Sequence, residues 1–147
     1  WRGCKSYNFC FKNLMKSKKS IENPRIIVIQ KLYGYFLSKD SEIVFPKHRY
    51  KKFIKDVVNG TIERKEIIED LMIKNLKNNI NDNKTELIIK LMIMAAIYEF
   101  MYMHKTPIKV IISEYLKVSD SFVDDGQKSF LNAILEKASK ISRTTNE

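Results

Sequence analysis

Apolar residues recur along this chain at the three- and four-residue spacing that is typical of amphipathic helices. The first such stretch follows Asn23 and Pro24, which suit the capping position and the first position of a helix. Its apolar positions are Ile26, Ile29, Leu32, Tyr33 and Phe36. A short polar linker, Ser38 to Pro46, is expected to follow this first helix.

The second helical pattern is longer and is expected to begin near Pro46. Its apolar positions are Tyr50, Phe53, Ile54, Val57, Val58, Ile62, Ile67, Ile68, Leu71 and Leu76. Gly60 weakens the middle of the pattern, because glycine is a poor helix former, so we predict one long, kinked helix. The charged residues from Glu63 to Asp70 mix both signs, which is typical of a solvated helix face.

The third pattern, from about Lys84 to Met103, follows an Asn-rich loop and is apolar nearly all round. A helix of this kind is expected at the centre of a bundle. Within it, Leu87 to Met103 is strongly apolar, but Lys90 and Glu99 interrupt this stretch, which is also shorter than the roughly 20 apolar residues of a membrane span. We therefore expect a buried helix and no membrane association.

Two further helices are predicted near the end of the chain. Thr106 should cap one of them, with Pro107 in its first position. A turn at 123–126 precedes the last helix, which is expected from Gln127 to Ile141. Its expected inward positions are Phe130, Leu131, Ile134, Leu135 and Ala138.

No stretch predicts a strand, so the sequence indicates an all-α bundle without internal repeats. A length of 147 residues favours one domain, which we expect over residues 23–141. Residues 1–22 form an expected basic, flexible segment, and residues 142–147 an expected frayed tail. Met15 would be a natural start for a basic arm, and a transit peptide is the alternative interpretation of the segment before it.

The net charge of +10 favours polyanionic partners such as RNA, DNA or anionic lipid. A chain rich in Ile, Lys and Asn is also what an AT-rich genome would encode. The two explanations differ in one respect, because codon bias spreads lysine evenly, whereas binding requires a patch of cations.

The sequence offers little catalytic chemistry. Cys4 and Cys10 are the only cysteines and are too few for a zinc site, while His48 and His104 lie on different elements without a neighbouring nucleophile motif. No phosphate-binding Gly loop is present. We therefore expect a non-enzymatic cytoplasmic protein without metal or cofactor.

Five segments, in this order and at this spacing, resemble the NusB family of transcription antitermination factors. They are Arg25 to Leu37, Phe53 to Leu76, Ala96 to Glu99, Thr106 to Glu114, and Phe130 to Lys137. The resemblance implies a compact bundle of about six to seven helices in two stacked subdomains. It also implies binding of boxA-like single-stranded RNA together with NusE, a small-subunit ribosomal protein, on elongating RNA polymerase during ribosomal RNA transcription. Some members of the family instead bury their RNA surface in a homodimer.

The resemblance also implies which residues bind. The expected RNA contacts are Lys16, Lys18, Lys19, Arg25, Tyr33, Lys128 and Phe130. Tyr33 and Lys90 are the expected partner contacts. Core packing is an equal alternative for Tyr33 and Phe130. The family favours Arg in the basic arm where this chain has mostly Lys, which keeps the charge but loses the bidentate geometry.

Several positions depart from the family pattern. They are Asn79 in place of a common Trp, Ile89 in place of an acid that helps dock NusE, Met94 in place of Arg, Gly126 in place of Asp, and Ser129 in place of Lys. These departures leave partner docking and RNA affinity less well supported than the fold.

Two alternative functions remain open from the sequence. One is the NusB-like accessory domain of an RNA cytosine methyltransferase, which would require a methyltransferase domain in the same gene. The other is a helical protein-interaction module without RNA binding.

Overall fold

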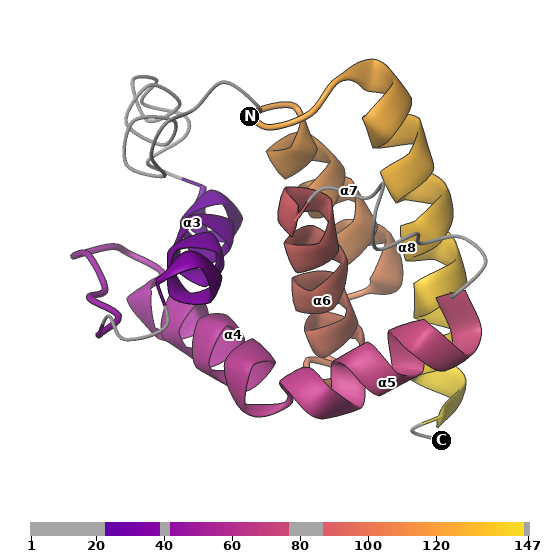
Figure 1. The fold of residues 1–147 in the computed structure, drawn as a ribbon, viewed down its shortest axis with the longest axis horizontal. Coiled ribbons are helices and arrows are strands. Elements are labelled where there is room, and N and C mark those ends of the chain that lie inside the picture. The colour runs from indigo at the N-terminus through magenta and orange to yellow at the C-terminus, as the bar shows by residue number, and fades with distance from the viewer. Residues whose placement is uncertain (1–22, 39–41, 77–86, 146–147) are drawn as a thin grey trace.

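The computed structural model describes residues 23–38, 42–76 and 87–145, and within these ranges every regular element is a helix (Figure 1). The helices are α3 (Pro24–Leu37), α4 (Lys51–Glu63), α5 (Lys65–Leu76), α6 (Leu87–Tyr102), α7 (Ile108–Ser119) and α8 (Asp125–Thr145). The predicted all-α bundle is therefore confirmed over the described residues.

Helix α6 forms the centre of the bundle because nearly its whole surface is apolar and buried. It packs against all five other helices. In Figure 1, α3 and α4 lie on one side of α6, α7 and α8 lie on the other, and α5 crosses one end. No helix in the described ranges combines the length and hydropathy needed to cross a membrane.

Helix α3 begins as the sequence predicts. The Asn23 side chain accepts a hydrogen bond from the backbone N–H of Arg25 at 3.1 Å, and Pro24 occupies the first turn. Ile29 and Leu32 are fully buried, whereas Tyr33 is only partly buried against the core. The apolar stripe of α3 is thus its packing face.

Helix α4 begins at Lys51, so the predicted start near Pro46 is wrong. Exposure alternates along residues 42–46, with Ile43 and Phe45 packed against the core and their neighbours exposed. This two-residue period belongs to an extended chain and not to a helix. Packing of these two side chains therefore delays the helix by about one turn.

The predicted long helix is divided at Arg64 and not at Gly60. Arg64 has φ −104° and ψ 19°, and its guanidinium stacks 4.2 Å from the ring centroid of Tyr102. Gly60 lies within α4, where a Cβ atom would overlap the ring of Tyr98. Glycine is therefore required here for a close approach between α4 and α6, and the change of direction occurs four residues later.

Helix α7 begins one residue later than predicted. Pro107 occupies the capping position with extended backbone angles, and no side chain caps the helix. Thr106 does not act as the cap. Its carbonyl oxygen instead accepts a hydrogen bond from Arg143 Nη2 at 2.9 Å.

Helix α8 is longer than predicted at both ends. Asp124 and Gln127 form a reciprocal capping pair, in which each side chain accepts a hydrogen bond from the other's backbone N–H. At the other end, Ser142 is fully buried and Arg143 is tied to Thr106, so the helix continues to Thr145. The predicted helix end at Ile141 is therefore wrong, because α8 includes the first four residues of the expected tail.

Candidate nucleic-acid interface

The residues expected to bind RNA do not form one described surface. Lys16, Lys18 and Lys19 lie outside the described residues. The structure places the other four, Arg25, Tyr33, Lys128 and Phe130, on α3 and at the start of α8. Their environments differ sharply, and each is described below.

Arg25 lies in the interior of the bundle. Its Nη2 donates to Glu99 Oε1 at 2.7 Å, and its Nε donates to Glu99 Oε2 at 3.2 Å. The two side chains are 11% and 0% exposed. Because this bidentate pair already occupies the guanidinium, the expected RNA contact at Arg25 does not fit the structure. The residue instead links α3 to α6.

Aromatic rings surround this ion pair. The Arg25 guanidinium lies 4.9 Å from the ring centroid of Phe53 and 5.7 Å from that of Tyr115. Burial alone would lower the pKa of Arg25, but the hydrogen bond and charge of Glu99 outweigh it and raise the pKa. Burial raises the pKa of Tyr115 well above its ordinary value, and the Glu99 carboxylate adds to this rise. The pair is therefore a charged, water-excluded junction between α3, α4, α6 and α7.

Tyr33 and Lys90, the expected partner contacts, are both partly exposed. Tyr33 packs against the core from α3, so part of its ring stabilises the bundle. Lys90 is the only cation on α6. Both side chains present some surface to a partner, and their binding roles stay predictions.

Lys128 and Phe130 lie in the first turns of α8. Lys128 Nζ pairs with Asp120 Oδ1 at 2.7 Å, and the two side chains are 36% and 58% exposed. Phe130 is partly buried against the core. Lys128 thus has a carboxylate partner at the surface, and Phe130 combines packing with partial exposure.

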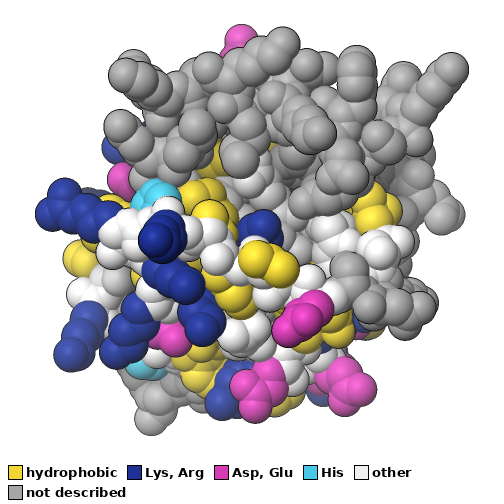
Figure 2. Space-filling view, turned by 90° about the vertical axis from the view of Figure 1, so that its left-hand side faces the viewer, with side chains coloured by type: hydrophobic (Ala, Val, Ile, Leu, Met, Phe, Trp, Pro, Cys, Tyr) yellow, Lys and Arg dark blue, Asp and Glu magenta, His cyan; other side chains and the backbone are white. Residues whose placement is uncertain are grey.

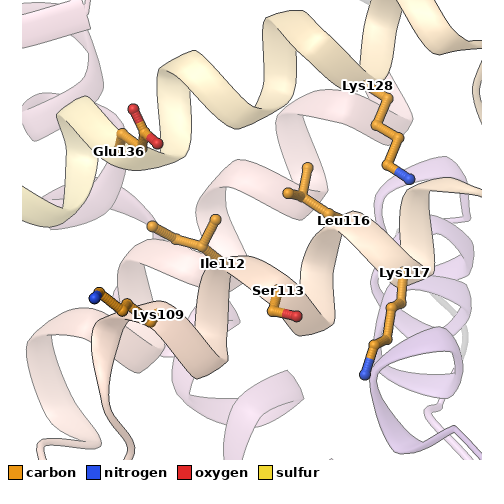
Figure 3. Close-up of a pocket in the computed structure, with 7 residues that line it drawn as sticks. All are labelled: Lys109, Ile112, Ser113, Leu116, Lys117, Lys128 and Glu136. Atoms are coloured by element: carbon orange, nitrogen blue, oxygen red, sulfur yellow. The ribbon is translucent and has the colours of Figure 1, made fainter.

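A cavity of about 380 Å³ lies between α7 and α8 (Figure 3). Its lining residues are Lys109, Ile112, Ser113, Leu116, Lys117, Lys128 and Glu136. Ile112 and Leu116 form an apolar floor from α7, Lys128 extends toward α7 from α8, and Glu136 lies further along α8. Lys117 pairs with Glu114 at 3.2 Å, so two of the three lysines have carboxylate partners. The cavity suits an apolar or aromatic group better than a bare anion.

A second basic region was not predicted from the sequence. We call Lys47, Arg49, Lys51, Lys52 and Lys55 the basic surface. All five side chains are exposed, and they lie in the segment before α4 and in its first two turns. The charge pattern of the sequence could have predicted this region, because residues 47–55 contain five Lys or Arg and no Asp or Glu.

The described part of the chain offers no metal site, since no group of three or more His, Cys, Asp and Glu side chains is suitably placed. His48 accepts a hydrogen bond at Nδ1 from the backbone N–H of Tyr50, and His104 is exposed on a different element. The arrangement supports binding and provides no described catalytic centre.

The departures from the family pattern lie in different environments. Ile89 and Met94 are 3% and 5% exposed, so both are part of the core. Gly126 and Ser129 are exposed at the start of α8. Asn79 lies outside the described residues. An acidic docking contact at position 89 is therefore replaced here by apolar packing.

Comparison with known proteins agrees with the fold. A sequence profile described as the NusB family matches residues 22–140. The solved structure of T. maritima NusB superposes with a TM-score of 0.69 and 21% identity, covering 86% of this chain and 93% of that one. At this identity the likeness extends to the fold alone.

Curated relatives carry the name transcription antitermination protein NusB. Those of Bacillus thuringiensis (strain Al Hakam) and Bacillus cereus (strain AH187) are each 29% identical over 84 residues. These matches cover 57% of this chain and 64% of each relative. The matched segment thus spans less than two thirds of the relatives' length.

Proposed function

The chain belongs to the NusB family, and on this premise we propose that it is a non-catalytic RNA-binding factor of transcription antitermination. The observation that carries the proposal is the family match over residues 22–140, which includes every described helix except the last residues of α8. The names of the Bacillus relatives support the same process.

We propose further that the RNA is a boxA-like single strand in a ribosomal RNA leader, bound together with NusE on elongating RNA polymerase. A net charge of +10 favours this ligand, because cations that neutralise phosphates release counterions. Partly exposed aromatic rings favour a single strand, whose bases can stack on them. Tyr33 and Phe130 are the aromatic candidates from the resemblance.

We leave Arg25 out of the proposed RNA contacts, since its guanidinium is bound to Glu99. Tyr33, Lys128 and Phe130 remain, together with the basic arm that contains Lys16, Lys18 and Lys19. Tyr33 and Lys90 remain the proposed contacts for NusE.

The test is a gel shift with boxA-like RNA, with and without the cognate NusE, across a salt series. We expect binding that weakens linearly in log salt and tightens when NusE is added. A scrambled RNA of the same length is the matched control. Equal affinity for both RNAs with NusE present, or no binding at low salt, would contradict the proposal.

A further inference from the structure

The basic surface at the start of α4 is the most one-sided concentration of charge in the described chain. Residues 47–55 carry five cations and no acid, whereas residues 56–76 carry three cations and five acids. Figure 2 shows Lys and Arg side chains gathered beside a histidine along one side of the face formed by α3, α4 and the segment before α4. Codon bias alone would not produce this contrast between adjacent segments.

The cations of the basic surface have no carboxylate partner among the described residues. Elsewhere the surface lysines are commonly paired, as in Lys65 with Glu69, Lys74 with Asp70, and Lys128 with Asp120. A cation without a carboxylate partner can neutralise a phosphate and release the counterion condensed on it, whereas a paired cation must first give up its carboxylate. Charge available for binding is therefore concentrated at the start of α4.

Aromatic rings are interleaved with these cations. The Arg49 guanidinium lies 5.5 Å from the ring centroid of Tyr50, and Lys55 Nζ lies 5.7 Å from that of Phe45. The rings of His48 and Tyr50 are 5.9 Å apart. Tyr50 is 47% exposed, so its ring is accessible to a base. Cations with exposed rings are the combination that binds single strands through phosphates and base faces.

The placement of these lysines is unfavourable for helix stability. Lys51 and Lys52 occupy the first two positions of α4, whose first turn contains no acid. The positive end of a helix dipole repels cations there, where acids would be stabilising. A structural explanation of the cluster therefore fails, and an anionic ligand would relieve the repulsion.

We propose that the basic surface is a second contact region for single-stranded RNA, separate from the residues that the family resemblance implies. The inference rests on the proposed RNA-binding function and extends it to residues far from Lys128 and Phe130 at the start of α8. In Figure 1 the segment before α4 lies at the left edge and α8 at the right. Of the large apolar side chains from 47 to 55, only Tyr50 is exposed, so the surface lacks the apolar face with which a helix enters lipid.

The test compares two doubly neutralised proteins in fluorescence anisotropy with labelled boxA-like RNA across a salt series. One carries Lys51→Gln and Lys52→Gln, and the matched control carries Lys65→Gln and Lys74→Gln, which removes the same charge from α5. We expect the first to bind about tenfold more weakly at low salt, with a slope in log salt that is smaller by about one. The control should bind like the wild type, and circular dichroism should show equal helical content in all three proteins.

A second pair of variants tests the aromatic component. Tyr50→Ala should weaken binding about tenfold, and Tyr50→Phe should restore it, because stacking requires the ring and not the hydroxyl. Equal weakening by Tyr50→Phe would contradict stacking.

The outcomes separate this inference from the proposed function. Unchanged RNA affinity in the Lys51/Lys52 variant would overturn the second contact region while leaving the proposed function intact. Equal weakening in both double variants would overturn it as well, because net charge would then be the cause. No RNA binding by the wild type would remove both proposals.

Binding to vesicles of phosphatidylserine and phosphatidylcholine is measured for the same proteins. If the Lys51/Lys52 variant loses vesicle binding but keeps its RNA binding, the basic surface is a lipid contact instead.

Discussion

The ion pair of Arg25 and Glu99 and the basic surface at the start of α4 use cations in opposite ways. Arg25 is buried, bidentate and surrounded by Phe53 and Tyr115, and its charge is matched by one carboxylate. The basic surface has five exposed cations with no described carboxylate partner. The first arrangement stabilises contacts between helices, and the second leaves charge available to a ligand.

The difference shows why the number of cations is a poor guide to a binding site. A net charge of +10 attracts polyanions to the whole molecule, but a cation that is held by a buried carboxylate is poorly placed to neutralise a phosphate. We therefore expect Arg25 to contribute little to RNA binding, although the resemblance implies an RNA contact there. Variants of the interior should therefore change stability, and variants of the basic surface should change affinity.

The largest expected effect comes from placing a single charge in the interior. Ile29→Asp should lower the free energy of unfolding by about 5 kcal/mol, because a fully buried site would lose apolar packing and gain a charge without a partner. Leu91→Asp, at 1% exposure, should behave similarly. Ile73→Asp is the control, since Ile73 is 61% exposed and should tolerate the change. Urea unfolding measures all three, and normal stability of the buried variants would refute the packing described here.

Removing one charge of the buried pair should have the next largest effect. Glu99→Gln leaves Arg25 without a counter-charge and should cost about 3–5 kcal/mol of stability. Glu69→Gln, in the exposed pair with Lys65, should cost less than about 1 kcal/mol. RNA affinity of the folded Glu99→Gln protein should match the wild type. A large loss of affinity without a loss of stability would reverse the contrast between the two regions.

Tyr33 shares features of the interior and of the surface, because its side chain is partly buried and partly exposed. Tyr33→Ala should weaken RNA or NusE binding by about 1–3 kcal/mol if a base or partner stacks on the ring. Helical content should stay intact. Tyr35→Ala, two residues along α3, controls for loss of a tyrosine from the same helix. Global unfolding of the Tyr33 variant would instead assign the ring to the core.

The smallest expected effect is a pH dependence from Tyr115. Burial raises the pKa of Tyr115, so above about pH 10 the folded state keeps a proton that the unfolded state loses. Stability should therefore fall as pH rises through this range, by about 1.4 kcal/mol per pH unit at most for one group. Tyr115→Phe should reduce the slope measured by urea unfolding between pH 10 and 11. An unchanged slope would show that burial of this hydroxyl does not govern the alkaline behaviour.

Much of the fold follows from local pattern. The start of α3 is predictable because Asn23 and Pro24 act within one turn, and the central place of α6 follows from its apolar surface. The start of α4 is not predictable in this way, since it depends on how Ile43 and Phe45 pack against the core. The extent of α8 depends on a contact between Arg143 and Thr106, which local pattern does not contain.

The candidate site shows the same limit. Arg25 and Glu99 are 74 residues apart, so their pairing is invisible to periodicity and Arg25 looks like any basic residue near a basic arm. The basic surface is a local run and was predictable from charge pattern alone. The absence of carboxylate partners for these cations within the described chain cannot be predicted from the sequence, because pairing is decided by the neighbouring helices.

Ultraviolet crosslinking of the protein to boxA-like RNA, with the crosslinked peptides identified by mass spectrometry, tests the central claim most directly. We predict crosslinks in the segment that contains Phe45, His48 and Tyr50, where the exposed ring of Tyr50 lies among cations that have no carboxylate partner in the described chain. Crosslinks confined to α5, whose lysines pair with acids, would contradict it.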